Sequence, residues 1–101
     1  MQKRRTDAKS LLQGGVSSRS EVLFQELPDR EAILLNLDTE SYFGLDPVAT
    51  TMYRALTAAP TVASAYEALQ AEFNVEPERL KRDLHAFVQT LLANGLVEFH
   101  S

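Results

Sequence analysis

The chain has 101 residues, 45% of them hydrophobic and 24% charged, with no cysteine and a formal net charge of −4. This composition is typical of one globular domain, and the lack of cysteine excludes disulfides, thiol catalysis and thiolate zinc sites. No apolar run is long enough for a membrane-spanning helix or a signal peptide, so we expect a cytoplasmic protein without a membrane partner.

The N-terminal segment differs in charge from the rest of the chain. Residues 1–19 contain five basic residues and one acidic residue, whereas residues 20–101 contain five basic and thirteen acidic residues. The segment also contains Gly14-Gly15 and few apolar residues. We therefore predict a flexible basic arm over residues 1–19 and one folded domain over residues 20–101. The functional alternative is an arm that contacts nucleic acid or a partner protein.

Three short strands are predicted after the arm. Residues 22–27 are rich in strand formers, and Pro28-Asp29-Arg30 supplies a turn. Residues 32–37 alternate, with Ile33, Leu35 and Leu37 on one face. A second turn at residues 38–40 leads to the strand from Ser41 to Leu45, so the three strands form an antiparallel meander.

Three helices follow the strands. Asp46 and Pro47 are typical of a helix start, with an apolar stripe at Val48, Met52, Tyr53 and Leu56. Thr61 caps a second helix, and Pro77 begins a third and longest helix that ends at Asn94-Gly95. The order βββααα predicts an α+β domain in which the helices cover one face of a small sheet, with a short extended segment after Gly95.

The sequence contains no pattern that supports catalysis. Its two histidines, His85 and His100, are not paired with each other or with carboxylates at metal-binding or acid–base spacing. Gly14-Gly15 lacks the other residues of a phosphate-binding loop. We expect no enzyme activity, no metal and no cofactor.

Nucleic-acid binding is the disfavoured alternative. The second and third helices resemble a helix-turn-helix, and Arg79, Lys81 and Arg82 begin the second of them. Acidic residues are interleaved with these cations, and residues 20–101 are acidic as a whole. A duplex-binding surface needs a positive excess that this helix lacks.

The strand from Ser41 to Leu45 is the candidate binding element. In a meander it lies at an edge of the sheet, where unpaired N–H and C=O groups can pair with another strand. It contains neither Lys nor Pro to block such pairing, and Gly44 permits close backbone approach. An extended peptide could add to this edge, and so could a second copy of the chain, which leaves a homodimer possible.

The spaced pattern of the chain resembles the PqqD family. It consists of Leu34-Leu35-Asn36-Leu37-Asp38-Thr39, then Tyr42-Phe43-Gly44-Leu45-Asp46, then Thr61-Val62 and the stretch from Leu80 to Val97. Glu40, Ala49 and Tyr53 depart from the glycine, glycine and tryptophan that are common in the family. The resemblance covers about residues 22–97.

The resemblance implies a winged-helix-like RiPP recognition element, which binds the leader peptide of a ribosomally made precursor and presents it to a modifying enzyme or leader protease. It implies that the leader lies between the third strand and the third helix. Carried onto this chain, the candidate peptide-binding residues are Ser41, Tyr42, Phe43, Gly44, Leu45, Arg79, Arg82, Asp83, Ala86, Phe87 and Thr90. A DNA-binding winged helix and a non-catalytic subunit of an enzyme complex remain the alternatives.

Overall fold

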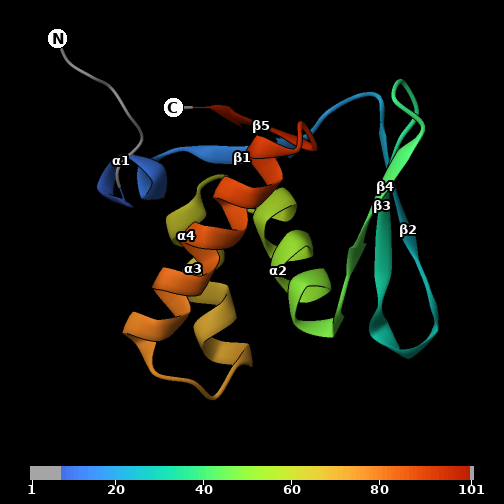
Figure 1. Cartoon of the computed structure of the whole chain (residues 1–101). Coiled ribbons are helices and arrows are strands. Elements are labelled where there is room, and N and C mark those ends of the chain that lie inside the picture. Colours follow the sequence, from blue (N-terminus) through green and yellow to red (C-terminus); the bar gives the residue numbers. More distant parts are fainter. Residues whose placement is uncertain (1–7, 101) are drawn as a thin grey trace, which may run out of the picture.

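The computed structural model describes the backbone of residues 8–100 and the side chains of residues 11–100. The elements follow in the order α1 (Ala8–Gln13), β1 (Gly15–Ser18), β2 (Val22–Glu26), the 3-10 turn η1 (Pro28–Arg30), β3 (Ala32–Asn36), β4 (Ser41–Leu45), α2 (Pro47–Ala58), α3 (Val62–Glu72), α4 (Pro77–Ala93) and β5 (Val97–His100). Figure 1 shows the three long helices packed together on one side of the β2-β3-β4 sheet, with the β1–β5 pair across one end of the helices.

The β2-β3-β4 sheet is the antiparallel meander that the sequence predicts. Leu34 lies opposite Phe24 on one side and Phe43 on the other. Along β3, Ala32, Leu34 and Asn36 are buried, whereas Ile33 and Leu35 are only partly buried. The period of two therefore turns one face of the sheet toward the helices and leaves the other face uncovered.

The helix boundaries follow from local signals in the sequence. The side chain of Asp46 accepts a hydrogen bond from the Ala49 N–H at 2.8 Å, with Pro47 at the first helical position. Thr61 and Ser64 form a capping box at the start of α3. Gly95 has φ +67 just after α4, the left-handed conformation that ends a helix at low cost for glycine. These observations confirm the predicted α+β class.

The core lies between the three long helices and the inner face of the sheet. On α2, Met52, Tyr53 and Leu56 of the predicted stripe are buried, and Thr50 is buried as well. Val48, the first residue of that stripe, is 52% exposed. Within residues 8–100, none of the helices combines the length and the hydrophobicity needed to cross a bilayer.

The predicted flexible arm needs correction over residues 8–19. These residues form α1 and β1, and β1 pairs with β5 so that Val16 lies opposite Phe99. Leu11 and Val16 are buried in the core at 1% and 4% exposure. The domain therefore starts before residue 20, while residues 1–7 of the predicted arm lie outside the described residues.

Close packing explains the glycine pair that suggested flexibility. A Cβ added at Gly14 would lie 2.5 Å from the His100 carbonyl oxygen, and one at Gly15 would lie 2.5 Å from the Pro60 carbonyl oxygen. The Gly14 carbonyl also accepts a hydrogen bond from the Val62 N–H at 2.7 Å. The two glycines let β1 approach β5 and the start of α3, so they serve packing and not mobility.

Candidate functional site

The backbone of β4 leaves the polar groups of Tyr42 and Gly44 unpaired. Residues of an antiparallel strand direct both backbone groups to one side, and the side alternates along the strand. The Leu37 N–H donates to the Glu21 carbonyl and the Leu27 N–H donates to the Glu31 carbonyl, so the odd-numbered residues of β3 pair with β2. The even-numbered residues of β3 therefore pair with β4, opposite its odd-numbered residues. The N–H and C=O groups of Tyr42 and Gly44 must face the open edge.

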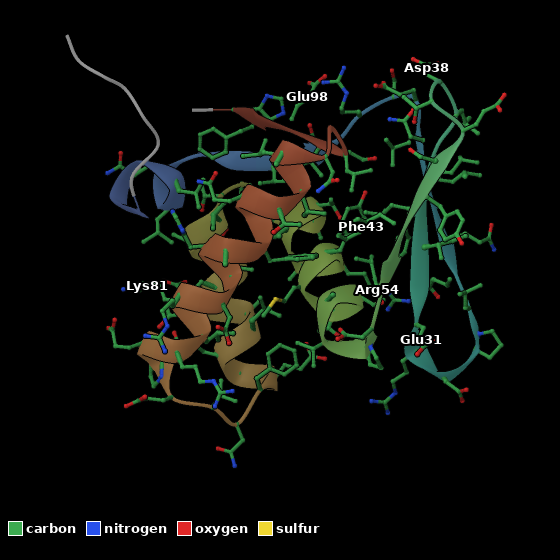
Figure 2. All side chains as sticks on the ribbon, in the orientation of Figure 1. Glu31, Asp38, Phe43, Arg54, Lys81 and Glu98 are labelled. Carbon is green, nitrogen blue, oxygen red and sulfur yellow. The ribbon has the colours of Figure 1, made fainter. Side chains whose placement is uncertain are left out.

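The side chains of β4 divide between the two faces of the sheet as expected. Leu45 is 3% exposed and Phe43 is partly buried against the core, and Figure 2 shows Phe43 extending toward the helices. Tyr42 is 74% exposed on the opposite face. A Cβ added at Gly44 would meet no atom within 4 Å, so the outer face beside Tyr42 is open.

The turn before β4 is organised by one buried amide. Asn36 is 7% exposed, and its Oδ1 accepts hydrogen bonds from the N–H groups of Asp38 at 2.9 Å and Thr39 at 3.1 Å. Glu40 has φ +59, a conformation that glycine adopts at less cost. Asp38 and Glu40 are exposed at this end of β4.

One face of α4 carries most of the predicted helix residues. With about 100° of rotation per residue, Arg79, Asp83, Ala86 and Thr90 lie along a single face. All four are exposed, and the Arg79 Nε lies 3.8 Å from an Asp83 carboxylate oxygen. Phe87 lies at the margin of this face and is partly buried against the core.

Arg82 lies at the other margin of this face, about 60° of helical rotation from Arg79. It lines a hollow of about 290 Å³ with Glu78, Lys81 and His85. Figure 2 shows Lys81 extending from α4 on the side away from the sheet. Arg82 follows Arg79 by three residues and precedes Ala86 by four, so the helical repeat places it beside both of them.

A polar hollow of about 470 Å³, which no pattern in the sequence predicted, lies between the β2–β3 hairpin and α2. None of the residues around it belongs to β4, and the hollow is lined by Glu26, Leu27, Arg30, Glu31, Thr50, Thr51, Arg54 and Glu72. Arg54 forms an ion pair with Glu26 across it. The sequence gives no signal for this hollow, because its lining residues come from four separate segments.

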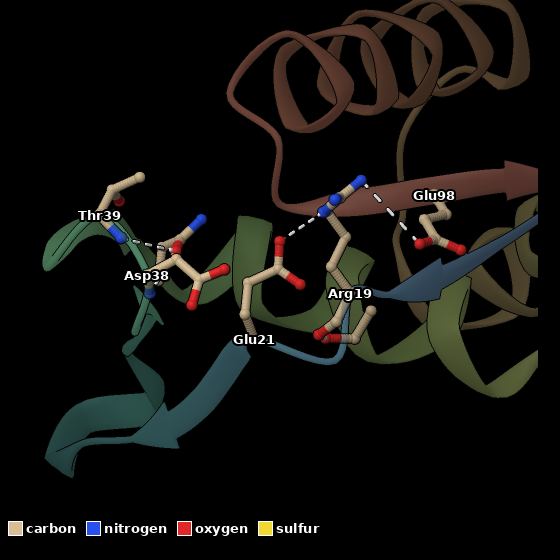
Figure 3. Close-up of polar contacts among 7 residues, drawn as sticks. Arg19, Glu21, Asp38, Thr39 and Glu98 are labelled. Carbon is tan, nitrogen blue, oxygen red and sulfur yellow. Dashed lines mark hydrogen bonds and ion pairs between the residues drawn. The ribbon is translucent and has the colours of Figure 1, made fainter.

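Arg19 forms ion pairs with Glu21 and Glu98 next to the start of β2, and Figure 3 shows it between them. The Arg19 carbonyl accepts a hydrogen bond from the Val22 N–H at 3.0 Å. The side-chain hydrogen bond from Arg19, at 2.7 Å, lowers the pKa of the Glu21 carboxyl and raises that of the guanidinium. Within the described residues, no cluster of three or more His, Asp or Glu side chains could hold a metal ion.

Comparisons with solved structures find two similar leader-peptide complexes. The first is TbiB1 in complex with the TbiA(beta) leader peptide, with 30% identity and a TM-score of 0.74, covering 81% of this chain and 94% of that chain. The second is a lasso peptide synthetase B1 complexed with its leader peptide, with 25% identity and a TM-score of 0.73, covering 82% and 96%. No curated protein matches the chain.

The family comparison agrees with both structures. The model described as coenzyme PQQ synthesis protein D matches residues 31–97, which include β3, β4 and all three long helices. It does not extend to α1 and β1. Since the match spans more than half of the sequence, the chain belongs to the PqqD family.

Proposed function

We propose that this protein is a RiPP recognition element that binds the leader peptide of a ribosomally synthesised precursor by strand addition to β4. The observation that carries the proposal is the open edge, where Tyr42 and Gly44 direct N–H and C=O groups away from β3. The similar solved structures hold leader peptides, which supports a peptide as the ligand.

The open edge accounts for affinity that does not depend on the peptide's side chains. A peptide strand laid beside β4 would exchange hydrogen bonds with the backbone groups of Tyr42 and Gly44, as in other cases of strand addition. Gly44 adds no side chain to obstruct the approach. Phe43, partly buried and turned toward the helices, would contact alternate side chains of the peptide.

We propose the exposed face of α4 as the opposite wall of the binding site. Lys81 extends away from the sheet (Figure 2), and Asp83 follows it by about 200° of helical rotation. The face with Arg79, Asp83, Ala86 and Thr90 would therefore turn toward β4, with Phe87 at its inner margin. Arg82 would lie at the other margin of this wall.

Binding of this kind involves no bond chemistry in the chain itself. The protein would tether the leader close to a modifying enzyme or leader protease and raise the local concentration of the core peptide. The cytoplasm, where precursor peptides are translated, is the proposed location.

Amide hydrogen exchange measured by NMR tests the proposed edge directly. The probe is the leader of the cognate precursor, to be identified among the short open reading frames near the gene, and fluorescence anisotropy measures its affinity. In the free protein the Tyr42 and Gly44 amides should exchange rapidly, whereas Phe43 and Leu45 should already be protected by pairing with β3. Leader binding should protect Tyr42 and Gly44. Protection that appears on β2 instead would contradict the proposal.

Duplex DNA is the comparison probe for the alternative function. The helix-turn-helix arrangement of α3 and α4 predicts binding that weakens steeply with salt if DNA is the partner. Salt-sensitive binding of a duplex without binding of the leader would favour the alternative.

A further inference from the structure

We infer that the edge of β4 selects a peptide segment in which basic side chains alternate with apolar ones. The inference rests on the proposed function, since it names the composition of the peptide that the same edge would bind. Its basis is the distribution of charge and open space around β4. Neither the family match nor the similar solved structures assign this preference to the chain.

Carboxylates lie at both ends of β4. Asp38 and Glu40 precede the strand, while Asp46 follows it and Glu31 lies beside Asp46 through the β3–β4 register. Figure 2 shows Asp38 and Glu31 at opposite ends of the sheet. Within the described residues, none of these four carboxylates forms an ion pair, so a strand along β4 would have uncompensated negative charge at each end.

The sheet as a whole has few cations to oppose this charge. Residues 20–46 contain seven acidic residues and one basic residue, Arg30. Arg30 lines the polar hollow beside α2 rather than the β4 edge. On α4, Arg79 is paired with Asp83, and Arg82, about 60° around the helix from Arg79, has Glu78 beside it in the same hollow. The potential along the edge should therefore be negative, which attracts basic peptides and repels acidic ones.

The outer face explains why the basic residues should alternate with apolar ones. An added strand would turn every second side chain to the face of Phe43 and the others to the face of Tyr42 and Gly44. Ile33 lies opposite Gly44 and is only partly buried, with open space above it. A Lys or Arg from the peptide could lay its aliphatic stem over Ile33 and extend its charge toward Asp46 or Glu31.

The test uses three fluorescein-labelled nine-residue peptides that differ in one feature. Each has Val at alternate positions, and the positions between carry Lys, Gln or Glu. In low salt, fluorescence anisotropy should give the highest affinity for the Lys peptide, then the Gln peptide, then the Glu peptide. The Lys peptide should bind about tenfold more tightly than the Glu peptide, because each exposed ion pair contributes little. The difference should shrink to about threefold in 0.5 M salt, where the charges are screened.

Two variants test whether the carboxylates cause the preference for the Lys peptide. The double variant Glu40→Gln, Asp46→Asn removes both charges, and Asn at position 46 can still cap α2. The preference for Lys over Glu should fall to about threefold. Glu40→Gly is a second variant, since glycine suits the left-handed backbone at this position and should leave the fold intact. Glu67→Gln, exposed on α3, is the matched control and should leave the preference unchanged.

Several outcomes would overturn the inference. Equal affinity for the three peptides, a preference for Glu, or an unchanged preference in the double variant would each show that these carboxylates select nothing. Failure of all three peptides to bind would reject this composition as the ligand of the edge. If the precursor leader still binds in any of these cases, the proposed function stands and only the charge selection fails.

Discussion

Strands β1 and β4 both contain glycine, but the surroundings of these glycines differ. A Cβ at Gly14, just before β1, or at Gly15 would collide with backbone carbonyls of β5 or of the segment before α3. A Cβ at Gly44 would meet nothing within 4 Å. The folded chain therefore requires the glycines at β1 for its own packing, whereas nothing in the described structure requires Gly44.

The backbone groups of the two strands show the same difference. The chain uses both sides of the β1 segment, through the ladder to β5 and the hydrogen bond between the Gly14 carbonyl and the Val62 N–H. At β4, residues 8–100 use only the side toward β3. Gly44 is not needed for packing among the described residues, and the edge of β4 on which it lies is not paired with another described strand. This edge is therefore available for a ligand.

The largest expected effect is the loss of stability in Gly14→Ala. The added methyl group would press on the ring of Phe99 and on the His100 carbonyl, and backbone cannot move away without disturbing β5. We expect a decrease of about 3 kcal/mol in the free energy of unfolding, measured by urea denaturation. Gly44→Ala is the matched control and should change stability by less than about 1 kcal/mol. Equal losses in the two variants would remove the distinction between the strands.

The next largest effect is the loss of leader affinity in Gly44→Pro. Proline removes an N–H that points to the open edge, and proline is tolerated at such edge positions. A buried acceptor on the peptide would lose its donor, so affinity should fall roughly 10–100-fold in fluorescence anisotropy.

The control for Gly44→Pro is Gly44→Ala, which keeps the N–H and should bind the leader within about threefold of the native chain. Circular dichroism should show a melting temperature for the proline variant close to that of the native chain. A folded proline variant with native affinity would contradict pairing at Gly44.

Local signals made the fold from β2 to α4 predictable. The Asp46-Pro47 start of α2 and the Asn94-Gly95 end of α4 are each specified within a few residues. The β1–β5 pair was not predictable, because β1 has four residues and its partner lies about 80 positions away. Gly14-Gly15 is typical of flexible segments, and only the neighbouring Phe99, His100 and Pro60 show that close packing requires it.

The candidate site was also predictable only where local patterns determine the positions of its residues. Alternation along Ser41 to Leu45 correctly separated the faces of Tyr42 and Phe43. The helical repeat places Arg79, Asp83, Ala86 and Thr90 on one face of α4, with Arg82 and Phe87 at its two margins. The polar hollow depends on the tertiary approach of α2 to the β2–β3 hairpin, which no local pattern encodes.

A smaller effect on β4 is expected from Asn36→Ala. The buried Oδ1 of Asn36 accepts two backbone hydrogen bonds that shape the turn before β4. Their loss should cost about 1–2 kcal/mol in urea denaturation, since the freed N–H groups of Asp38 and Thr39 lie at an exposed turn where water can reach them. Asn74→Ala, at an exposed position between α3 and α4, should be nearly neutral. If Asn36→Ala were also neutral, the turn geometry would not depend on the side chain.

The smallest effect is expected from a substitution of Glu21, which forms an ion pair with Arg19 at the start of β2. Within the described residues, β4 has no comparable ion pair. The hydrogen bond from Arg19 holds the pKa of the Glu21 carboxyl below its ordinary value in the folded protein. A carboxyl with a lowered folded pKa stabilises the fold above its unfolded pKa, and that contribution is lost as the pH falls through the folded pKa. Glu21→Gln should therefore lower the melting temperature slightly at pH 7, and the gap should close as the pH falls through the lowered pKa of the folded protein. Because water still reaches this half-buried pair, the gap should be only a few degrees at most and should shrink in high salt. A gap that stays constant from neutral to acidic pH would show that Glu21 acts through packing and not through its charge.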